Sequence, residues 1–304
     1  MSANDNLKKQ FDHDSSGGSV NTNIKDYLEA QSKTGTINDM LSDWADDNGA
    51  TGALNDLLKA RFGETGTGSS LNDRSNSFLL NNYSIAFDGS DDYIALGSET
   101  NLRADFSISA WVAPNYTTYE GILGSKSSDD SLVAIKSSTD LRVRLHKAGG
   151  GNQYADWDTG LTDIPTDGSW THIVVTKTGT TLTPYFNGTK GTTGTLSGLG
   201  TFKVQMIGGL DADNTLGYKF AGNIDEVAIW DTLLDDDAVT AIYNSGTPIS
   251  LTSNSGNYDN SSNLVGWWRM GDGDTYPTIT DNSGNKNDGT MTNMASDDIE
   301  ENTP

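Results

Sequence analysis

A period of two in the apolar residues, running in short stretches from Tyr83 to Trp230, is the feature that most limits what this chain can fold into. In "YSIAFDG" the large residues Tyr83, Ile85 and Phe87 occupy every second position, and "FSISAWVAP" repeats this pattern. Side chains of a β-strand alternate between two faces, so each stretch predicts a strand with one buried face. The other stretches of this kind are "DYIALG", "LVAIKS", "LRVRLHK", "WTHIVVTK", "TLTPYFNG", "FKVQMIGG" and "NIDEVAIW".

The connections between these stretches consist mostly of Gly, Asn, Asp, Ser and Thr, and none has helical spacing. Many short strands without intervening helices favour an antiparallel sandwich or jelly roll over an alternating α/β fold. Asn187-Gly188 predicts a hairpin between two strands. After Trp230 the spacing becomes helical in "DTLLDDDAVTAIYNSG", which ends at Gly246. We therefore predict a mainly β chain, an antiparallel two-sheet jelly-roll sandwich preceded by a region of short helices.

The sequence before Tyr83 is organised differently. Residues 1–20 are polar and rich in glycine and serine, which is typical of a flexible arm, whereas residues 21–82 have helical spacing. The phrase "TGTINDML", which starts at Thr34, returns seventeen residues later as "TGALNDLL". Helices this short are unstable alone in water and need a partner surface. We therefore predict a docking face made of Ile37, Met40, Leu41, Trp44, Leu54, Leu57, Leu58 and Phe62.

Charge and composition exclude several classes of function. The chain has 304 residues, of which 42 are acidic and 19 basic, and its formal net charge is −23. An acidic surface repels phosphate backbones, so we expect no nucleic-acid partner. The chain has no cysteine, which excludes thiolate sites, and no stretch approaches the roughly 18 to 20 apolar residues that span a bilayer. We therefore expect no membrane insertion, and the first residues lack the apolar core of a secretory signal.

Four stretches together resemble the laminin-G-like, concanavalin A-like jelly roll. In chain order they are "YSIAFDGSDDYIALG", "FSISAWVAP", "DGSWTHIVVTKTGTTLTPYFNGTKG" and "IGGLDADNTLGYKFAGNIDEVAIWDTLLDDDAVTAIYNSG". They follow the order of that family's strands from about Tyr83 to Gly246. The resemblance implies two packed antiparallel sheets.

The stretch from Leu264 to Met291, which begins "LVGWW", resembles the phrase that commonly opens such a domain, although here it follows the rest. The 41 residues from Leu264 onward are too few for a second sandwich. We expect them to add a strand to the same sandwich, so that residues 83–304 form one jelly roll with an acidic tail. The alternative is a truncated module that a neighbouring chain completes. Because strand side chains alternate, Trp267 and Trp268 cannot both face the core, so one should cover the outside of the sheet or an interface.

The repeated helical phrases beside a laminin-G-like domain resemble structural proteins of tailed bacteriophages. The resemblance implies a capsid decoration protein or a tail or head appendage that docks on other virion proteins through its N-terminal region. It also implies a location on the surface of an extracellular particle, in multiple copies and with a homo-oligomer as one arrangement. Head and tail both stay open as locations.

Calcium is the cofactor that the jelly-roll resemblance implies, because the family often binds it at the edge of the sandwich. "TDNSGNKND" offers Asp281, Asn285 and Asp288, and Asp225 matches the acidic position of the family's "G.IDEV" phrase. Carboxylate and amide oxygens are the ligands that calcium prefers. We predict a calcium site from these four residues, with plain turn chemistry as the alternative for the loop.

Carbohydrate binding would use exposed aromatic rings together with polar groups on loops. Tyr116, Tyr119, Tyr154 and Trp157 lie in loop-like sequence and are the candidates. For Trp157, burial in the core is an equal alternative.

Glucanases of the same superfamily place paired carboxylates on one face of a sheet, and this chain is not expected to do so. Asp225 and Glu226 are adjacent, so in a regular strand they should point to opposite faces. The three histidines, His13, His146 and His172, are scattered and predicted to be structural. We therefore predict a non-enzymatic virion structural protein that displays the sandwich for attachment to host-surface glycans. The alternatives are a free, calcium-dependent lectin-like adhesin and, third, a glycan hydrolase.

Overall fold

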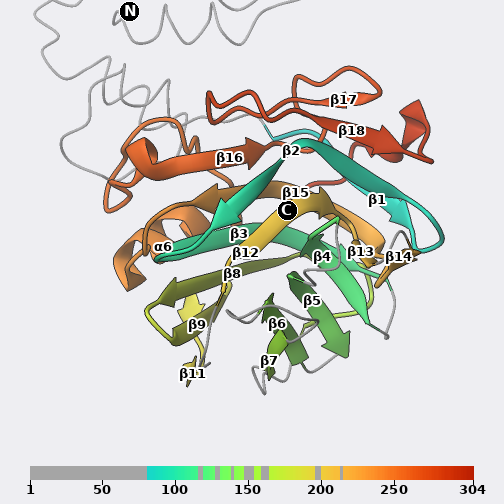
Figure 1. Ribbon diagram of the computed structural model, residues 1–304. Helices are drawn as coiled ribbons and strands as arrows, with labels where there is room; N and C mark the ends of the chain where they lie inside the picture. The colour runs from blue at the N-terminus through green and yellow to red at the C-terminus, as the bar shows by residue number, and fades with distance from the viewer. Residues whose placement is uncertain are drawn as a thin grey trace, which may run out of the picture. The chain divides into compact units, whose positions relative to one another are not determined.

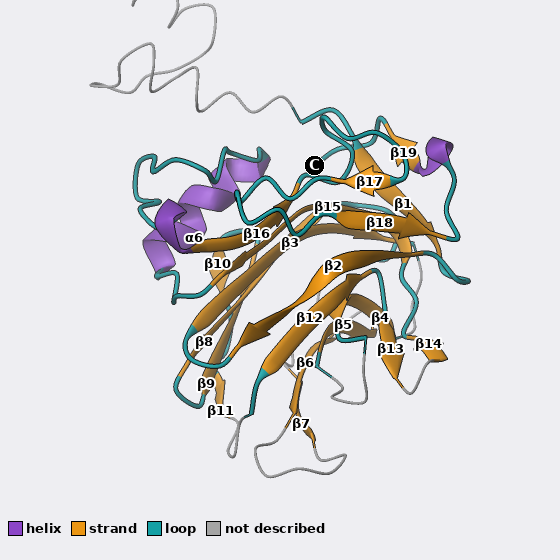
Figure 2. Cartoon of the chain, turned by 45° about the horizontal axis from the view of Figure 1, so that its top comes forward, coloured by secondary structure: helices purple, strands orange, loops and turns teal. Residues whose placement is uncertain are grey.

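The computed structural model describes residues 81–304 apart from 116–118, 127–130, 138–139, 147–153, 159–163, 196–199 and 213–214. The predicted arm, the helical repeats and the docking face lie outside the described residues. The described strands form two antiparallel sheets that stack face to face as layers (Figures 1 and 2). This arrangement confirms the predicted mainly β sandwich.

The first sheet has nine strands and the second has eight. In spatial order the first contains β10 (Thr189–Lys190), β9 (Thr181–Phe186), β8 (Thr171–Thr178), β3 (Phe106–Pro114), β15 (Ala221–Trp230), β1 (Ser84–Asp88) and β19 (Ile299–Glu300), with β11 (Gly194–Thr195) beside β9 and β16 (Leu264–Trp268) beside β15. The second contains β17 (Thr278–Ile279), β18 (Gly289–Thr292), β2 (Tyr93–Leu102), β12 (Phe202–Ile207), β4 (Glu120–Gly124), β5 (Leu132–Ser137), β6 (Asp140–His146) and β7 (Tyr154–Asp158). A separate hairpin joins β13 (Leu210–Ala212) to β14 (Thr215–Gly217).

The main core lies between the two sheets and is built by the alternation seen in the sequence. Ile85 and Phe87 of β1 face it from the first sheet, and Val143 of β6 and Phe202 of β12 face it from the second. Complete burial of a large apolar side chain contributes roughly 1.5 to 3 kcal/mol. The hairpin predicted at Asn187-Gly188 connects β9 to β10, with positive φ at both residues, as its turn type requires.

The C-terminal residues complete the same sandwich. β16 pairs with β15, β18 pairs with β2, and β19 pairs with β1, so this segment adds strands to both sheets. Figure 1 shows the red strand β18 beside β2, which is far away in sequence. Trp268 faces the main core, whereas Trp267 packs in a second cluster on the outside of the first sheet. The structure thus favours the added-strand prediction over the truncated module.

That outer cluster is covered by helix α6 (Asp236–Tyr243), which confirms the helical spacing predicted after Trp230. The Asp235 side chain accepts a hydrogen bond from the Ala238 amide and caps the helix, while Asn244 ends it in a left-handed conformation. Ala238 and Ile242 pack in the cluster with Trp230. Three short 3-10 turns follow in the described chain: η1 (Asn244–Gly246), η2 (Ser261–Asn263) and η3 (Ser296–Asp298).

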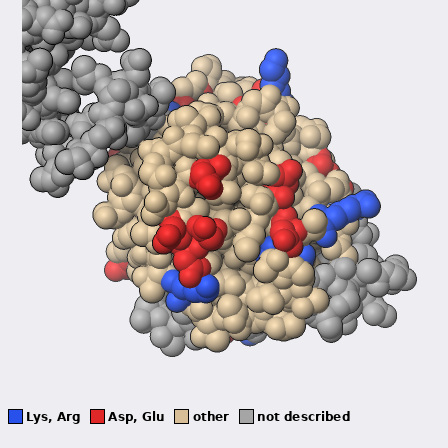
Figure 3. All heavy atoms as spheres, turned by 90° about the vertical axis from the view of Figure 1, so that its left-hand side faces the viewer, with Lys and Arg blue, Asp and Glu red and all other residues tan. Residues whose placement is uncertain are grey.

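The acidic balance of the sequence is visible at the surface. On the face drawn in Figure 3 the carboxylates gather over the middle, with a few lysine and arginine side chains around them. Within the described part of the chain, no helix has the length and apolar character needed to cross a membrane.

Candidate functional site

Two tyrosines and two arginines meet on the outer face of the second sheet. Tyr119 directly precedes β4 and Tyr218 directly follows β14, and their ring centroids are 4.6 Å apart. The guanidinium carbon of Arg142 lies 5.2 Å from the ring centroid of Tyr119, and that of Arg144 lies 5.9 Å from the ring centroid of Tyr218. We call these four residues the tyrosine–arginine patch.

The sequence of β6 explains why the two arginines share this face. Arg142 and Arg144 alternate with Leu141, Val143 and Leu145, which all face the main core. The arginines must therefore point outward, away from the core.

An apolar floor lies beneath the patch. Across the sheet, Ala134 of β5 pairs with Arg142, and Leu132 pairs with Arg144. These two apolar residues form a buried cluster with Leu210, against which both tyrosines pack.

The chemistry of the patch suits a small polar ligand with an apolar face. Both tyrosines are half-buried, so part of their surface is accessible, although the hydroxyl oxygen of Tyr119 is itself buried. Aromatic faces pack on C–H groups, and a guanidinium group offers five N–H donors in a fixed plane. A pyranose ring, with C–H groups on one face and hydroxyls around its edge, fits this combination.

The four predicted carbohydrate residues have different outcomes. Tyr119 belongs to the patch, and Tyr116 lies outside the described residues. Tyr154 and Trp157 lie in strand β7, beside β6, and not in a loop as their surroundings suggested. Their backbones pair with His146 and Val143, respectively. Their assignment to a binding site stays a prediction.

Sequence reasoning missed three members of the patch. The alternation in "LRVRLHK" was a signal that Arg142 and Arg144 share one face of a strand. Tyr218 gave no comparable signal, because only the packing of the β13–β14 hairpin brings it to Tyr119.

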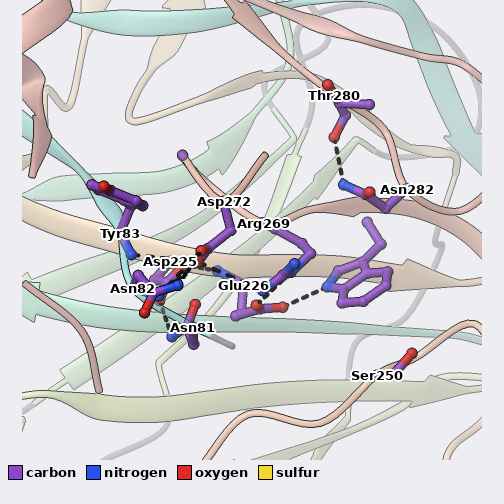
Figure 4. Close-up of polar contacts among 12 residues, drawn as sticks. Asn81, Asn82, Tyr83, Asp225, Glu226, Ser250, Arg269, Asp272, Thr280 and Asn282 are labelled. Atoms are coloured by element: carbon purple, nitrogen blue, oxygen red, sulfur yellow. Dashed lines mark hydrogen bonds and ion pairs between the residues drawn. The ribbon is translucent and has the colours of Figure 1, made fainter. Parts of the chain in front are cut away.

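A second polar group surrounds Asp225 and Glu226, and here the prediction was wrong. The pairing of β15 with β3 shifts register between Asp225 and Ala228, and Glu226 has a φ of 47°. Such a bulge inserts an extra residue and interrupts the alternation of side chains. Ile224 and Val227 on either side both face the main core, so the two carboxylates lie together and not on opposite faces. Figure 4 shows them in one group with Arg269 and Asp272, which we call the acid cluster.

Hydrogen bonds engage both oxygens of Glu226. Its Oε2 accepts from the Trp267 indole at 2.6 Å, and its Oε1 accepts from Nε of Arg269 at 3.2 Å. Arg269 also lies 3.6 Å from Oδ2 of Asp272. Burial raises the pKa of Glu226 to about 7, although the nearby Arg269 acts in the opposite direction.

The other carboxylates of the acid cluster hold the first described residues. Oδ2 of Asp225 accepts from Nδ2 of Asn81 at 2.7 Å, and both oxygens of Asp272 accept from the Asn82 amide at 3.1 Å. Asp225 is 0% exposed and Glu226 is 4% exposed. Burial, followed by the charge of Glu226, raises the pKa of Asp225 well above its usual range. A glycosidic bond must lie between two accessible carboxyls, and this pair is closed to it.

The loop predicted to bind calcium is held by its own hydrogen bonds. Oδ1 of Asp281 accepts from the amides of Trp267 and Ser283, and Oδ2 accepts from the amide of Asn287. Asp288 in turn accepts from the Asp281 amide at 2.9 Å. These bonds use the oxygens that a cation would need at Asp281.

The four predicted calcium ligands do not form one set in the described structure. Asp281, Asn285 and Asp288 share the loop, where the Asn285 amide group donates to the carbonyl of Val265 at 3.2 Å, whereas Asp225 lies in the acid cluster. Within the described ranges, the carboxylates that come within 4.8 Å of one another in a group of three are those of Asp88, Asp91 and Asp92. Calcium binding stays a prediction.

Of the three histidines, His172 has a described side chain, and it is buried on β8. Its Nε2 lies 2.8 Å from Oγ of Ser109, and its ring packs against Trp111 and Tyr243. Burial lowers the pKa of His172 to about 3, which keeps the ring neutral. This buried, neutral histidine agrees with the structural role predicted for it.

Two stacked antiparallel sheets, with the C-terminal strands returning to both, define a concanavalin A-like jelly roll. The chain belongs to the laminin-G-like family described as the concanavalin A-like lectin/glucanases superfamily, whose sequence model matches residues 88–240. No curated protein sequence matches the chain.

Several solved structures resemble this fold. A candidate carbohydrate-binding protein of Bacteroides ovatus has a TM-score of 0.52 and 17% sequence identity. The match covers 71% of this chain and 60% of that protein. A heptameric SAP-like pentraxin of Limulus polyphemus has a TM-score of 0.44 and 15% identity, covering 54% of this chain and 83% of the pentraxin. The CBM40 of a Ruminococcus gnavus IT-sialidase, bound to α2,3-sialyllactose, has a TM-score of 0.41 and 14% identity, covering 53% of this chain and 96% of the module. At these identities the likeness shows the fold alone.

Proposed function

We propose that this sandwich is a lectin-like module that binds a saccharide at the tyrosine–arginine patch. The observation that carries the proposal is the pair of half-buried rings 4.6 Å apart, with an arginine over each. The family includes lectins, and the fold is shared with a candidate carbohydrate-binding protein. The buried carboxylate pair gives no support to a hydrolase reading, so binding without catalysis is the function we favour.

In this proposal the rings and the arginines have separate roles. A sugar ring packs on the exposed part of Tyr119 or Tyr218, which excludes water from its C–H face. Arg142, which is half-buried, then donates to hydroxyl or carboxylate oxygens at the edge of the sugar, whereas Arg144, which is 6% exposed, packs against the ring of Tyr218. The apolar floor of Leu132 and Ala134 keeps the two tyrosines in place, so little ordering cost arises on binding.

Truncating Tyr218 to alanine should weaken saccharide binding at least tenfold, which corresponds to about 1.4 kcal/mol. The reason is the loss of a ring face and of the packing that orients Tyr119. A glycan array with the full chain identifies a saccharide, and isothermal titration calorimetry then compares the variants. Tyr276→Ala is the matched control, because Tyr276 is 43% exposed and belongs to the C-terminal segment. Equal affinities of wild type and Tyr218→Ala would exclude the patch.

We further propose that residues 21–82 attach the module to a phage particle, where the sandwich would serve as an attachment domain. The support is the repetition of "TGTINDML" as "TGALNDLL", since repeated short amphipathic helices need a partner surface. Deleting residues 1–80 should then remove the chain from purified particles, as measured by mass spectrometry. Absence of the intact chain from particles would reject this role and leave the free adhesin.

Loss of glycan binding with a chelator would support the predicted dependence on calcium.

A further inference from the structure

Glu120 is a carboxylic acid buried directly beneath the patch. It is the first residue of β4, it is 1% exposed, and neither of its carboxyl oxygens has a hydrogen-bond partner. The preceding residue Tyr119 packs on the outer face, so Glu120 points the other way, on the side of its cross-strand partner Ile135 in the main core. An ionised carboxylate in such a place is strongly disfavoured.

The surroundings of Glu120 do little to stabilise an ionised carboxylate. Burial raises the pKa of Glu120 to about 7. The backbone of Ala221, the first residue of β15, acts in the opposite direction, although it makes no hydrogen bond of good geometry to either carboxyl oxygen. From β5 the facing residue is the apolar Ile135, and no charged side chain among the described residues contributes to the shift.

The start of β4 also positions both rings of the patch. Tyr119 precedes Glu120 in the chain, and the amide of Gly121 donates to the carbonyl oxygen of Tyr218 at 2.5 Å. The two backbones approach so closely that a Cβ at Gly121 would lie 2.8 Å from that oxygen. A displacement of the first residues of β4 therefore moves Tyr119 relative to Tyr218.

We propose that Glu120 is a pH-sensitive gate of the tyrosine–arginine patch. Its neutral form lets β4 pack against the core, which holds Tyr119 against Tyr218 and under Arg142. Its ionised form requires water, and the shortest route to water is an outward shift of the first residue of β4, which separates the rings. The patch is therefore assembled in mildly acidic solution and loosened at pH 8. The consequence for ligand binding, tighter binding at acidic pH than at pH 8, rests on the proposed saccharide function.

The sign of the effect on stability follows from proton binding. The pKa of Glu120 in the fold is higher than the ordinary glutamate value of 4.5, so the folded state binds the proton more tightly than the unfolded state. The contribution of Glu120 to stability is full below pH 4.5 and is lost as the pH rises to about 7. Ionisation of Glu120 alone should raise the unfolding constant by up to about 100-fold over this range. Glu120→Gln, which keeps the shape of the side chain and cannot ionise, should remove this part of the pH dependence of stability.

The test uses the full chain with ¹³C-labelled tyrosine, observed by NMR between pH 5 and pH 8. Wild type should show ring resonances of Tyr119 and Tyr218 that shift with a midpoint near pH 7, assigned through Tyr119→Phe and Tyr218→Phe. In Glu120→Gln these shifts should be absent, while the exposed Glu301→Gln control should behave like wild type. Circular dichroism confirms that each variant is folded. Shifts that persist unchanged in Glu120→Gln, or that are absent from wild type, would overturn the gate.

Saccharide titrations separate the gate from the proposed function. With the saccharide identified on the array, affinity should fall several-fold from pH 6 to pH 8 in wild type and stay constant in Glu120→Gln. An equal fall in both proteins would reject the gate and leave the binding site intact. Ring shifts that depend on Glu120, in a chain that binds no saccharide at any pH, would support the gate and reject the function.

Discussion

A chain that ends at Asn263 should fail to form the sandwich. The missing residues supply β16, β17, β18 and β19, which pair within both sheets. They also supply buried apolar side chains, each contributing roughly 1.5 to 3 kcal/mol, and domain stability totals only about 5 to 15 kcal/mol. These buried side chains include those of Trp267, Trp268, Met270, Ile279 and Met291.

Circular dichroism and chemical unfolding measure this expectation. The matched control ends at Glu300 and removes only the last four residues, including Asn302, whose side chain accepts from the indole of Trp170 at 3.3 Å. That control should unfold cooperatively with nearly unchanged stability. A cooperative β-sheet transition in the chain ending at Asn263 would show that the C-terminal segment is dispensable, and the account of the sandwich would be wrong.

Replacing Arg269 with alanine should lower the free energy of unfolding by about 3 to 5 kcal/mol. Arg269 is the cation of the acid cluster, where it contacts Glu226 at 3.2 Å and Asp272 at 3.6 Å. Without it, the buried carboxylates face each other with no compensating charge. Part of the penalty should be relieved at low pH, because protonation of Glu226 removes a negative charge from the cluster.

The control for Arg269→Ala is an ion pair on the surface. Lys190 and Asp236 lie 2.8 Å apart, with side chains 47% and 59% exposed. Exposed pairs of this kind contribute less than about 1 kcal/mol, so Lys190→Ala should have little effect. Urea unfolding measures the free energy of unfolding of the two variants. If Arg269→Ala lowers the free energy of unfolding no more than Lys190→Ala does, the ion pairs of the acid cluster do not stabilise the sandwich.

Alternation in the sequence was enough to predict most of the fold. Ile85 and Phe87 face the core because a strand with one solvent-exposed face must place its apolar residues on the opposite face. The same rule predicted that Trp267 and Trp268 would separate, and they do. The strands β17 and β19 were missed because each has two residues, too few to show any period.

The bulge at Asp225 and Glu226 could not be predicted from alternation. It depends on a positive φ at Glu226, a conformation that is uncommon outside glycine and that nothing in "NIDEVAIW" signals. For a related reason, only part of the candidate site could be predicted from the sequence. Tyr119 was found by its residue type, but Tyr218 meets it only after the β13–β14 hairpin packs on the second sheet, which is a property of the tertiary structure.

The most direct test of the proposed function is to locate a bound saccharide on the sandwich. With a saccharide identified by the array, NMR titration of the full chain should perturb the side-chain resonances of Arg142 and Arg144 and the rings of Tyr119 and Tyr218 more than any others. Perturbations confined to the outside of the first sheet, around helix α6, or a complete absence of binding across the array, would contradict the assignment of the tyrosine–arginine patch as the glycan site.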